Sequence, residues 1–277
     1  MLDHTTIDQL RSLRLDGFAT GLEEQLGQPN LHGMSFEERL ALLVDREVNA
    51  RTDRKQTRLL QKARLKFPRA AIEDIDSRAG RGIDRKTFMS LALSDWIGHG
   101  DAILLTGATG VGKTWLACAL GQYACRRGFS ALYLRVPRLA EELRVLHGSG
   151  GFGKWLVQLA KTDVVILDDW GVTALDAATR ADLLEIIDDR AAHKATIITT
   201  QLPVDHWHAW IGDATIADAM LDRILQRVHR VDLSGPSLRD PQLDAPAKKA
   251  AAKTATPTQK PATEAPIRDA HTPATKT

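Results

Sequence analysis

The residues of this chain best suited to chemistry are glycines, a lysine and a threonine in one short run. Residues 107 to 114 read Gly-Ala-Thr-Gly-Val-Gly-Lys-Thr, the pattern G-x-x-x-x-G-K-[ST] of a phosphate-binding loop. Glycines permit backbone angles that other residues resist, so that main-chain N–H groups can surround anionic oxygens. Lys113 adds a charge for the outer phosphates, and Thr114 offers a hydroxyl to Mg²⁺. We expect a nucleotide on Gly107, Ala108, Thr109, Gly110, Val111, Gly112, Lys113 and Thr114.

Two acidic residues follow a second apolar run, where residues 163 to 171 read Asp-Val-Val-Ile-Leu-Asp-Asp-Trp-Gly. Four consecutive β-favouring residues are typical of a strand buried on both faces of a parallel sheet. Ligands bind at the carboxyl ends of such strands. We predict that Asp168 supports Mg²⁺ and that Asp169 polarises the water that attacks the terminal phosphate. The alternative is that a polar pair simply ends a buried strand.

A third polar position follows the run 196–200, because Pro203 cannot continue a central strand. Gln201, or failing it Thr200, could reach the attacking water or the terminal phosphate. The alternative is again an ordinary polar strand end. The expected cofactors are ATP and Mg²⁺, because the Asn-Lys-x-Asp motif of guanine-specific loops is missing: the only asparagines are Asn30 and Asn49.

Composition places the chain among ordinary globular proteins. Its 277 residues suffice for one substantial core plus a small second unit, and a net charge of +2 gives no dominant global field. Cys118 and Cys125 fall about 10 Å apart on one expected helix, too far for a disulfide, which fits a reducing compartment. No apolar run reaches the roughly 20 residues needed to cross a membrane, and the first residues do not resemble a signal peptide. We therefore expect a cytoplasmic protein without a membrane partner.

Three regions differ in their patterning. Residues 1–75 show helical periodicity and predict a small all-α domain, in which Ser35 and Glu38 form a capping box. Residues 76–240 alternate strands and helices, which predicts an α/β fold with a parallel sheet. Residues 241–277 are rich in Ala, Lys, Thr and Pro and predict a disordered tail. The expected strands are 102–106, 131–135, 164–168, 196–200 and 228–233, and the main expected helices of the second region are 113–127, 137–147, 177–192 and 215–227.

A run of basic residues between 51 and 69 carries Asp53 as its single acid. On a helix, steps of three and four place six cations on one stripe, where like charges repel one another. Nucleic-acid phosphates would offset that repulsion, with little sequence readout. A solvated basic face is the alternative. The predicted DNA-binding stripe consists of Arg51, Lys55, Arg58, Lys62, Lys66 and Arg69.

These residues resemble the IstB family of insertion-sequence transposition helpers, which is related to the DnaC helicase loaders within the AAA+ ATPases. The resemblance covers roughly residues 5 to 240. Gln201 departs from the Asn common among relatives. The matching stretches are 13–17, 35–40, 104–114, 166–171, 201–204 and 217–223.

The resemblance implies a sheet order of 5-1-4-3-2 and ATP hydrolysis, stimulated by DNA, in a homo-oligomer that assembles on double-stranded DNA beside a partner transposase. It also implies that Arg223 is supplied to a neighbouring subunit's ATP. A surface salt bridge to Asp222 or Asp218 is the alternative for Arg223, and Arg239 is a weaker candidate for sensing phosphate. Two rival functions are a DnaC-like replicative helicase loader and a small-molecule kinase.

Overall fold

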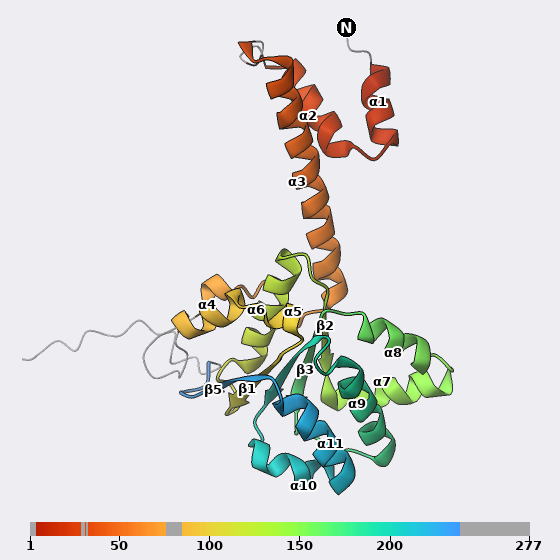
Figure 1. The fold of residues 1–277 in the computed structure, drawn as a ribbon, viewed down its shortest axis with the longest axis vertical. Coiled ribbons are helices and arrows are strands. Elements are labelled where there is room, and N and C mark those ends of the chain that lie inside the picture. The colour runs from red at the N-terminus through yellow and green to blue at the C-terminus, as the bar shows by residue number, and fades with distance from the viewer. Residues whose placement is uncertain (1–3, 29–30, 32, 76–84, 239–277) are drawn as a thin grey trace, which may run out of the picture. The chain divides into compact units, whose positions relative to one another are not determined.

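The computed structural model describes residues 4–28, 31, 33–75 and 85–238 (Figure 1). Five parallel strands form one sheet in the order β2-β3-β4-β1-β5. Read from its other edge, this is the predicted order 5-1-4-3-2, so the α/β fold class is confirmed. The strands are β1 (Ala102–Gly107), β2 (Ala131–Arg135), β3 (Val164–Trp170), β4 (Ala195–Thr200) and β5 (Val228–Leu233).

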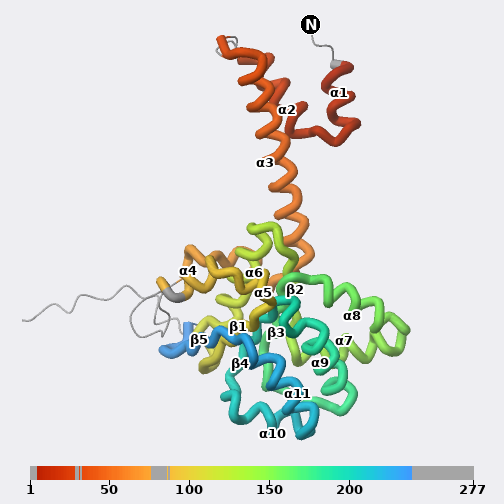
Figure 2. Tube along the Cα trace, in the orientation of Figure 1, coloured from red at the N-terminus to blue at the C-terminus, as the bar shows by residue number. Residues whose placement is uncertain are grey.

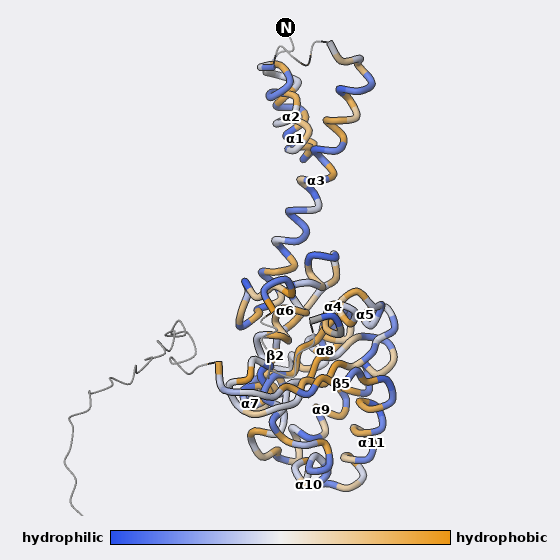
Figure 3. The backbone as a smooth tube through the Cα atoms, turned by 90° about the vertical axis from the view of Figure 1, so that its left-hand side faces the viewer, coloured by the Kyte–Doolittle hydropathy of each residue, from blue (hydrophilic) through white to orange (hydrophobic). Residues whose placement is uncertain are grey.

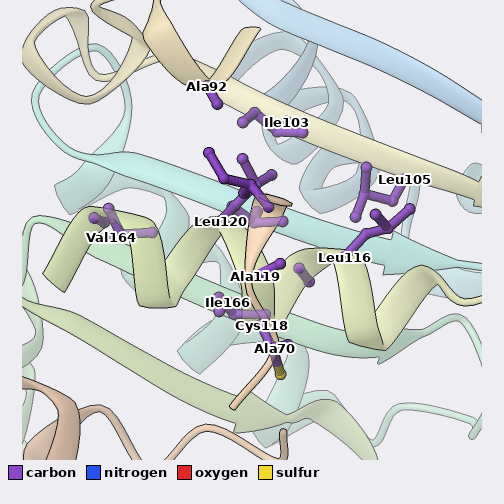
Figure 4. Close-up of a cluster of buried hydrophobic side chains, with 14 of the residues drawn as sticks. Ala70, Ala92, Ile103, Leu105, Leu116, Cys118, Ala119, Leu120, Val164 and Ile166 are labelled. Atoms are coloured by element: carbon purple, nitrogen blue, oxygen red, sulfur yellow. The ribbon is translucent and has the colours of Figure 1, made fainter. Parts of the chain in front are cut away.

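Helices cover both faces of the sheet because neighbouring strand residues point to opposite sides. On one face, Ile103 and Ile166 pack with the residues of α6 (Lys113–Arg126), α4 (Arg85–Leu93) and α5 (Trp96–His99). Figure 4 shows Leu120 of α6 near Ile103 and Leu116 of α6 beside Leu105.

On the other face, Leu104, Leu167 and Ile198 pack against five helices. Trp170 at the end of β3 and Trp207 are both fully buried there, with ring centroids 5.5 Å apart. These large side chains fix the end of β3, where the predicted catalytic acids lie. The helices of this face are α7 (Val136–Gly148), α8 (Phe152–Ala160), α9 (Ala177–Arg190), α10 (Trp207–Ile211) and α11 (Ala214–Leu225).

The N-terminal part contains α1 (His4–Ser12), α2 (Asp16–Leu26) and α3 (Phe36–Ala63). The predicted capping box is present: the Glu38 N–H donates to Ser35 Oγ at 3.2 Å, and the Ser35 N–H donates to Glu38 Oε2 at 2.8 Å. Gly17 allows α2 to approach α3 closely, since a Cβ there would lie 2.7 Å from the Ala50 Cβ. Figure 2 follows α3 as one continuous helix.

The helix predicted across 51–69 ends earlier than expected. Arg64 adopts a left-handed conformation with φ of 50° and terminates α3 after Ala63. Lys66 and Arg69 are exposed but lie beyond the helix, so the six-residue helical stripe is wrong at its last two members. Two short 3₁₀ helices, Ile72–Asp74 and Val204–His206, complete the described elements. The predicted tail, 241–277, lies outside the described residues.

Both cysteines are buried in α6, as free thiols. Burial raises the pKa of each to about 11, so they stay protonated and unreactive at neutral pH. Within the part of the chain that the structure describes, no helix combines the length and the apolar character of a membrane span.

Candidate nucleotide-binding site

The phosphate loop forms the turn from β1 into α6, as its motif predicts. Gly107, Gly110 and Gly112 have φ angles of 140°, 88° and 101°, a region that residues with a Cβ rarely adopt. A Cβ on Gly107 would also lie 2.2 Å from the carbonyl oxygen of Leu233. Lys113 begins α6, and its Nζ donates to the carbonyl oxygens of Gly107 at 2.7 Å and Ala108 at 2.8 Å. The loop thus keeps its cation beside the N-terminus of a helix, where phosphate binds favourably.

Asp168 is the best-positioned acid of the site. It is fully buried at the end of β3, and its Oδ1 accepts hydrogen bonds from Thr114 at 2.7 Å and from Thr199 at 2.6 Å. Its Oδ2 accepts one from the Tyr133 hydroxyl at 2.6 Å. Burial, followed by this bond to Asp168, raises the pKa of Tyr133, so Tyr133 remains a donor. All three donors are neutral hydroxyls, which orient the carboxylate without cancelling its charge.

This donor set fits Mg²⁺. Among the described residues there is no cluster of three His, Cys, Asp or Glu side chains that could hold a metal alone. Magnesium in nucleotide sites instead takes a hydroxyl, one or two carboxylates, water and the substrate phosphates. Thr114 and Asp168, in direct contact next to the phosphate loop, provide that combination.

Asp169 lies one residue further, in a different conformation. Its φ of 61° is left-handed, which Asp tolerates better than most residues. The Asp169 N–H donates to Thr199 Oγ1 at 3.2 Å, and the carboxylate accepts from Arg135 Nε at 2.7 Å. The hydrogen bond and charge of Asp169 raise the pKa of Arg135. Asp169 lines the same pocket as Lys113 and is therefore placed to face a bound phosphate.

Gln201 follows β4 and also lines this pocket. Its Oε1 accepts a hydrogen bond from the Thr109 hydroxyl of the phosphate loop at 2.6 Å. The ends of β1, β3 and β4 therefore bring Lys113, Thr114, Asp169 and Gln201 around one cavity, and Asp168 is hydrogen-bonded to Thr114 of that set.

Arg223 is located elsewhere. It lies on α11, where its guanidinium pairs with Asp188 of α9 and donates to the Ala219 carbonyl at 3.0 Å. The pairing partner differs from Asp222 and Asp218, the two alternatives suggested by sequence. Arg223 lines a pocket with Ala102 and Thr196, at the starts of β1 and β4, the opposite edge of the sheet from the phosphate loop.

The sequence motifs did not predict several residues of the site. Tyr133 and Arg135 come from β2, whose register beside β3 places Arg135 opposite Asp168. Thr199 precedes Thr200, the residue that the sequence suggested. Its hydroxyl donates to the Asp168 carboxylate and accepts from the Asp169 backbone N–H. The only available signal was the polar end of each strand, which does not reveal a partner.

The apolar residues at the border of the nucleotide pocket were not predicted from the sequence either. Phe67, Trp115 and Leu238 line the pocket, and the Leu238 N–H donates to the Gly110 carbonyl at 2.9 Å. The segment after β5 therefore contacts the phosphate loop directly. Arg239, the weaker phosphate-sensing candidate, lies outside the described residues.

A parallel sheet of this order, with a phosphate loop after β1 and acids at the end of β3, defines a nucleotide-binding protein of the P-loop class. Comparison with known families identifies the branch. A model of the IstB-like ATP binding protein family matches residues 8–244. The chain belongs to this family: it binds ATP, and its enzymatic activity is ATP hydrolysis.

Individual relatives support this assignment. The chain is 56% identical over 203 residues to a Pseudomonas fluorescens protein named for ATP binding and insertion sequence IS1162, covering 73% of this chain and 88% of the relative. It is 46% identical over 239 residues to the insertion-sequence protein y4pL of Sinorhizobium fredii (strain NBRC 101917 / NGR234), covering 86% and 97%. The fold is similar to the crystal structure of the DnaC helicase loader, with a TM-score of 0.52, 21% identity, and coverage of 60% of this chain and 97% of that one.

Proposed function

We propose that this ATPase binds duplex DNA, assembles on it in the presence of ATP, and assists a partner transposase in DNA transposition. The relatives named for insertion sequences support the transposition context. The observation that carries DNA binding is a row of exposed cations on α3: Arg51, Lys55, Arg58 and Lys62. Steps of four and three keep them on one helix face, a spacing suited to a phosphate backbone. Lys66 and Arg69 would add contacts from the segment after the helix.

We infer the following roles at the nucleotide. Lys113 and the loop N–H groups hold the outer phosphates of ATP, and Thr114 and Asp168 hold Mg²⁺, which neutralises charge on those phosphates when bound. Asp169 orients the attacking water and accepts its proton, and Gln201 contacts the water or the terminal phosphate. Because Arg135 pairs with Asp169 at 2.7 Å, that ion pair must loosen before the carboxylate can act as a base.

Arg223 acts on a neighbouring subunit in this proposal. The six residues of β1 span about 20 Å, and Arg223 lies near the start of that strand while the phosphate loop follows its end. An arginine side chain cannot cross that distance within its own subunit. A head-to-tail assembly would bring it to the next subunit's ATP, and hydrolysis would remain slow in an isolated chain.

The DNA-binding proposal is tested with a variant in which Arg51, Lys55, Arg58 and Lys62 are all replaced by alanine. We expect duplex binding to weaken uniformly across sequences and the slope of log affinity against log salt to fall by about 4. Fluorescence anisotropy at several salt concentrations measures both. The matched control removes four exposed cations from α7, α8 and the residue after α8: Arg138, Arg144, Lys154 and Lys161. Equal losses in the two variants would show a net-charge effect and refute the stripe.

The partner is tested separately, because the DnaC likeness shows only the fold. Pull-down with the transposase of the insertion sequence that encodes this chain should succeed, and pull-down with the replicative helicase should fail. The opposite result would establish a helicase loader. Formation of a phosphorylated small-molecule product would instead establish the rival function of a small-molecule kinase.

A further inference from the structure

An exposed arginine with aromatic neighbours lies just beyond α6. Arg127 forms the C-cap of this helix. Its guanidinium carbon lies 5.6 Å from the centroid of the Phe129 ring and 6.0 Å from that of the Tyr123 ring. Among the described residues no carboxylate forms an ion pair with Arg127. The rings therefore restrict where the guanidinium lies, while its in-plane N–H groups can still donate to an acceptor from outside.

The preceding residue, Arg126, shows what a structural cation looks like at the same place. Its Nη2 donates to both carboxylate oxygens of Glu73 at 2.9 Å. A cation at a helix C-terminus is favourable for the helix, and Arg126, as the last residue of α6, already supplies one. Arg127 adds a second positive charge at this helix end, and no acid of the described chain compensates it.

A cation of the basic row on α3 approaches the same turn. The Nζ of Lys55 lies 3.0 Å from the position that a Cβ on Gly128 would take. Gln56, the next residue of α3, donates from Nε2 to the Arg126 carbonyl oxygen at 2.9 Å, so α3 is attached to the end of α6 at this level. Figure 3 shows mostly hydrophilic turns in this second half of α3. Two exposed cations from separate elements are thus brought to one turn, where like charges repel each other.

We propose that Arg127 contacts the backbone of duplex DNA next to the phosphate held by Lys55, so that the basic row continues from α3 onto the ATPase part of the chain. The inference rests on the DNA-binding function proposed above and adds to it a residue outside α3. Phosphates beside these two cations offset their repulsion and release counterions. Arginine suits the position, because its planar fork can donate two N–H groups to phosphate while its face lies over a ring.

The salt dependence of duplex binding tests the contact, using the full-length chain, a fluorescent duplex and anisotropy. Arg127→Ala should weaken binding several-fold at low salt and lower the slope of log affinity against log salt by about 1. Arg127→Lys keeps the charge and should keep the slope. Arg138→Ala removes an exposed cation of α7 and is the matched control, with no expected change. An unchanged slope in Arg127→Ala, or equal losses in Arg127→Ala and Arg138→Ala, overturns the proposal.

A double variant tests whether Arg127 continues the row. Lys55→Ala and Arg127→Ala together should lower the salt slope by about 2, because each cation neutralises a phosphate of its own. A slope equal to that of Lys55→Ala alone would show that Arg127 meets no further phosphate. If the unmodified chain binds no duplex, the DNA-binding function itself fails. If it binds duplex and the Arg127 variants bind equally well, DNA binding stands and only this inference is rejected.

Discussion

Two buried carboxylates, one in each region of the molecule, are stabilised in opposite ways. Glu47 in α3 accepts the Phe18 N–H at 3.1 Å and pairs with Arg51 at 2.6 Å and Arg54 at 3.5 Å. Asp168 at the sheet edge accepts from three hydroxyls and from no guanidinium or ammonium group in the described part of the chain. At Glu47 the protein's own arginines compensate the negative charge. At Asp168 the hydroxyls orient the carboxylate but leave its charge available to a bound cation.

The difference is the one expected between a structural acid and the ligand-binding acid that we propose Asp168 to be. A buried charge without a compensating partner is costly, so a protein keeps one where a cation arrives from outside. Glu47 links α2 to α3, and its charge is already compensated by Arg51 and Arg54. Asp168 is held at a fixed position next to Thr114, which suits a site whose positive charge comes with the nucleotide.

The largest expected effect is at the phosphate loop. Lys113→Ala removes the charge that the loop holds beside α6, and we expect ATP turnover to fall to background. Phosphate release measures it, with the exposed Lys161→Ala as the control. Turnover within twofold of the parent would show that the loop is not the site of hydrolysis.

Arg223→Ala should lower turnover by about 10³-fold while leaving ATP affinity unchanged, because its guanidinium acts only on a neighbour's transition state. Mixed with Lys113→Ala, it should recover part of the activity, since one intact site forms between the two variants. Asp188→Ala is the control for the ion pair on α11. Equal loss in Asp188→Ala, with no recovery on mixing, would indicate a structural role.

Tyr133→Phe sharpens the contrast at Asp168 by deleting one of its three donors. We expect the Mg²⁺ concentration for half-maximal nucleotide binding to rise about tenfold, while nucleotide binding in EDTA stays the same. Calorimetric titration measures both. Tyr123→Phe replaces the only other tyrosine and should change neither value. Equal shifts in the two variants would contradict a positioning role for Tyr133.

The smallest effect is at Glu47. Burial tends to raise its pKa, but the hydrogen bond and charge of Arg51 and the Phe18 N–H outweigh burial, so the pKa lies below the ordinary 4.5. A lowered pKa stabilises the fold above pH 4.5, and that contribution is lost as the pH falls through the folded-state value. Glu47→Gln should cost about 1–3 kcal/mol and remove this pH dependence. Hydrogen exchange of the Phe18 amide measures it, with exposed Asp53→Asn as the control.

The sheet and the phosphate loop could be predicted because their signals are local. Buried strands such as 164–168 appear as continuous apolar runs, and the loop motif requires β1 before it and α6 after it. The expected β2 and β5 agree with the structure residue for residue. Helix α8 was not among the expected helices, because residues 148–151 before it read Gly-Ser-Gly-Gly and glycines favour a break in a helix.

Other features depend on tertiary contacts that no local pattern contains. The Tyr133–Asp168 bond requires β2 to lie beside β3 in one register. Helix α3 ends at Ala63 because Arg64 adopts a left-handed conformation, although Arg favours helices. The roles of Gln201, Arg223 and the α3 cations remain predictions.

The contact between Leu238 and Gly110 has a practical consequence for anyone shortening this chain. A Cβ built on Gly110 would lie only 2.0 Å from Ser237 Oγ. The residues that follow β5 therefore pack directly against the phosphate loop. Expression versions for crystallography should therefore end after Leu238. Cutting at Leu233, where β5 ends, would remove the backbone amide that bonds to Gly110 and weaken ATP binding, although every motif residue would still be present.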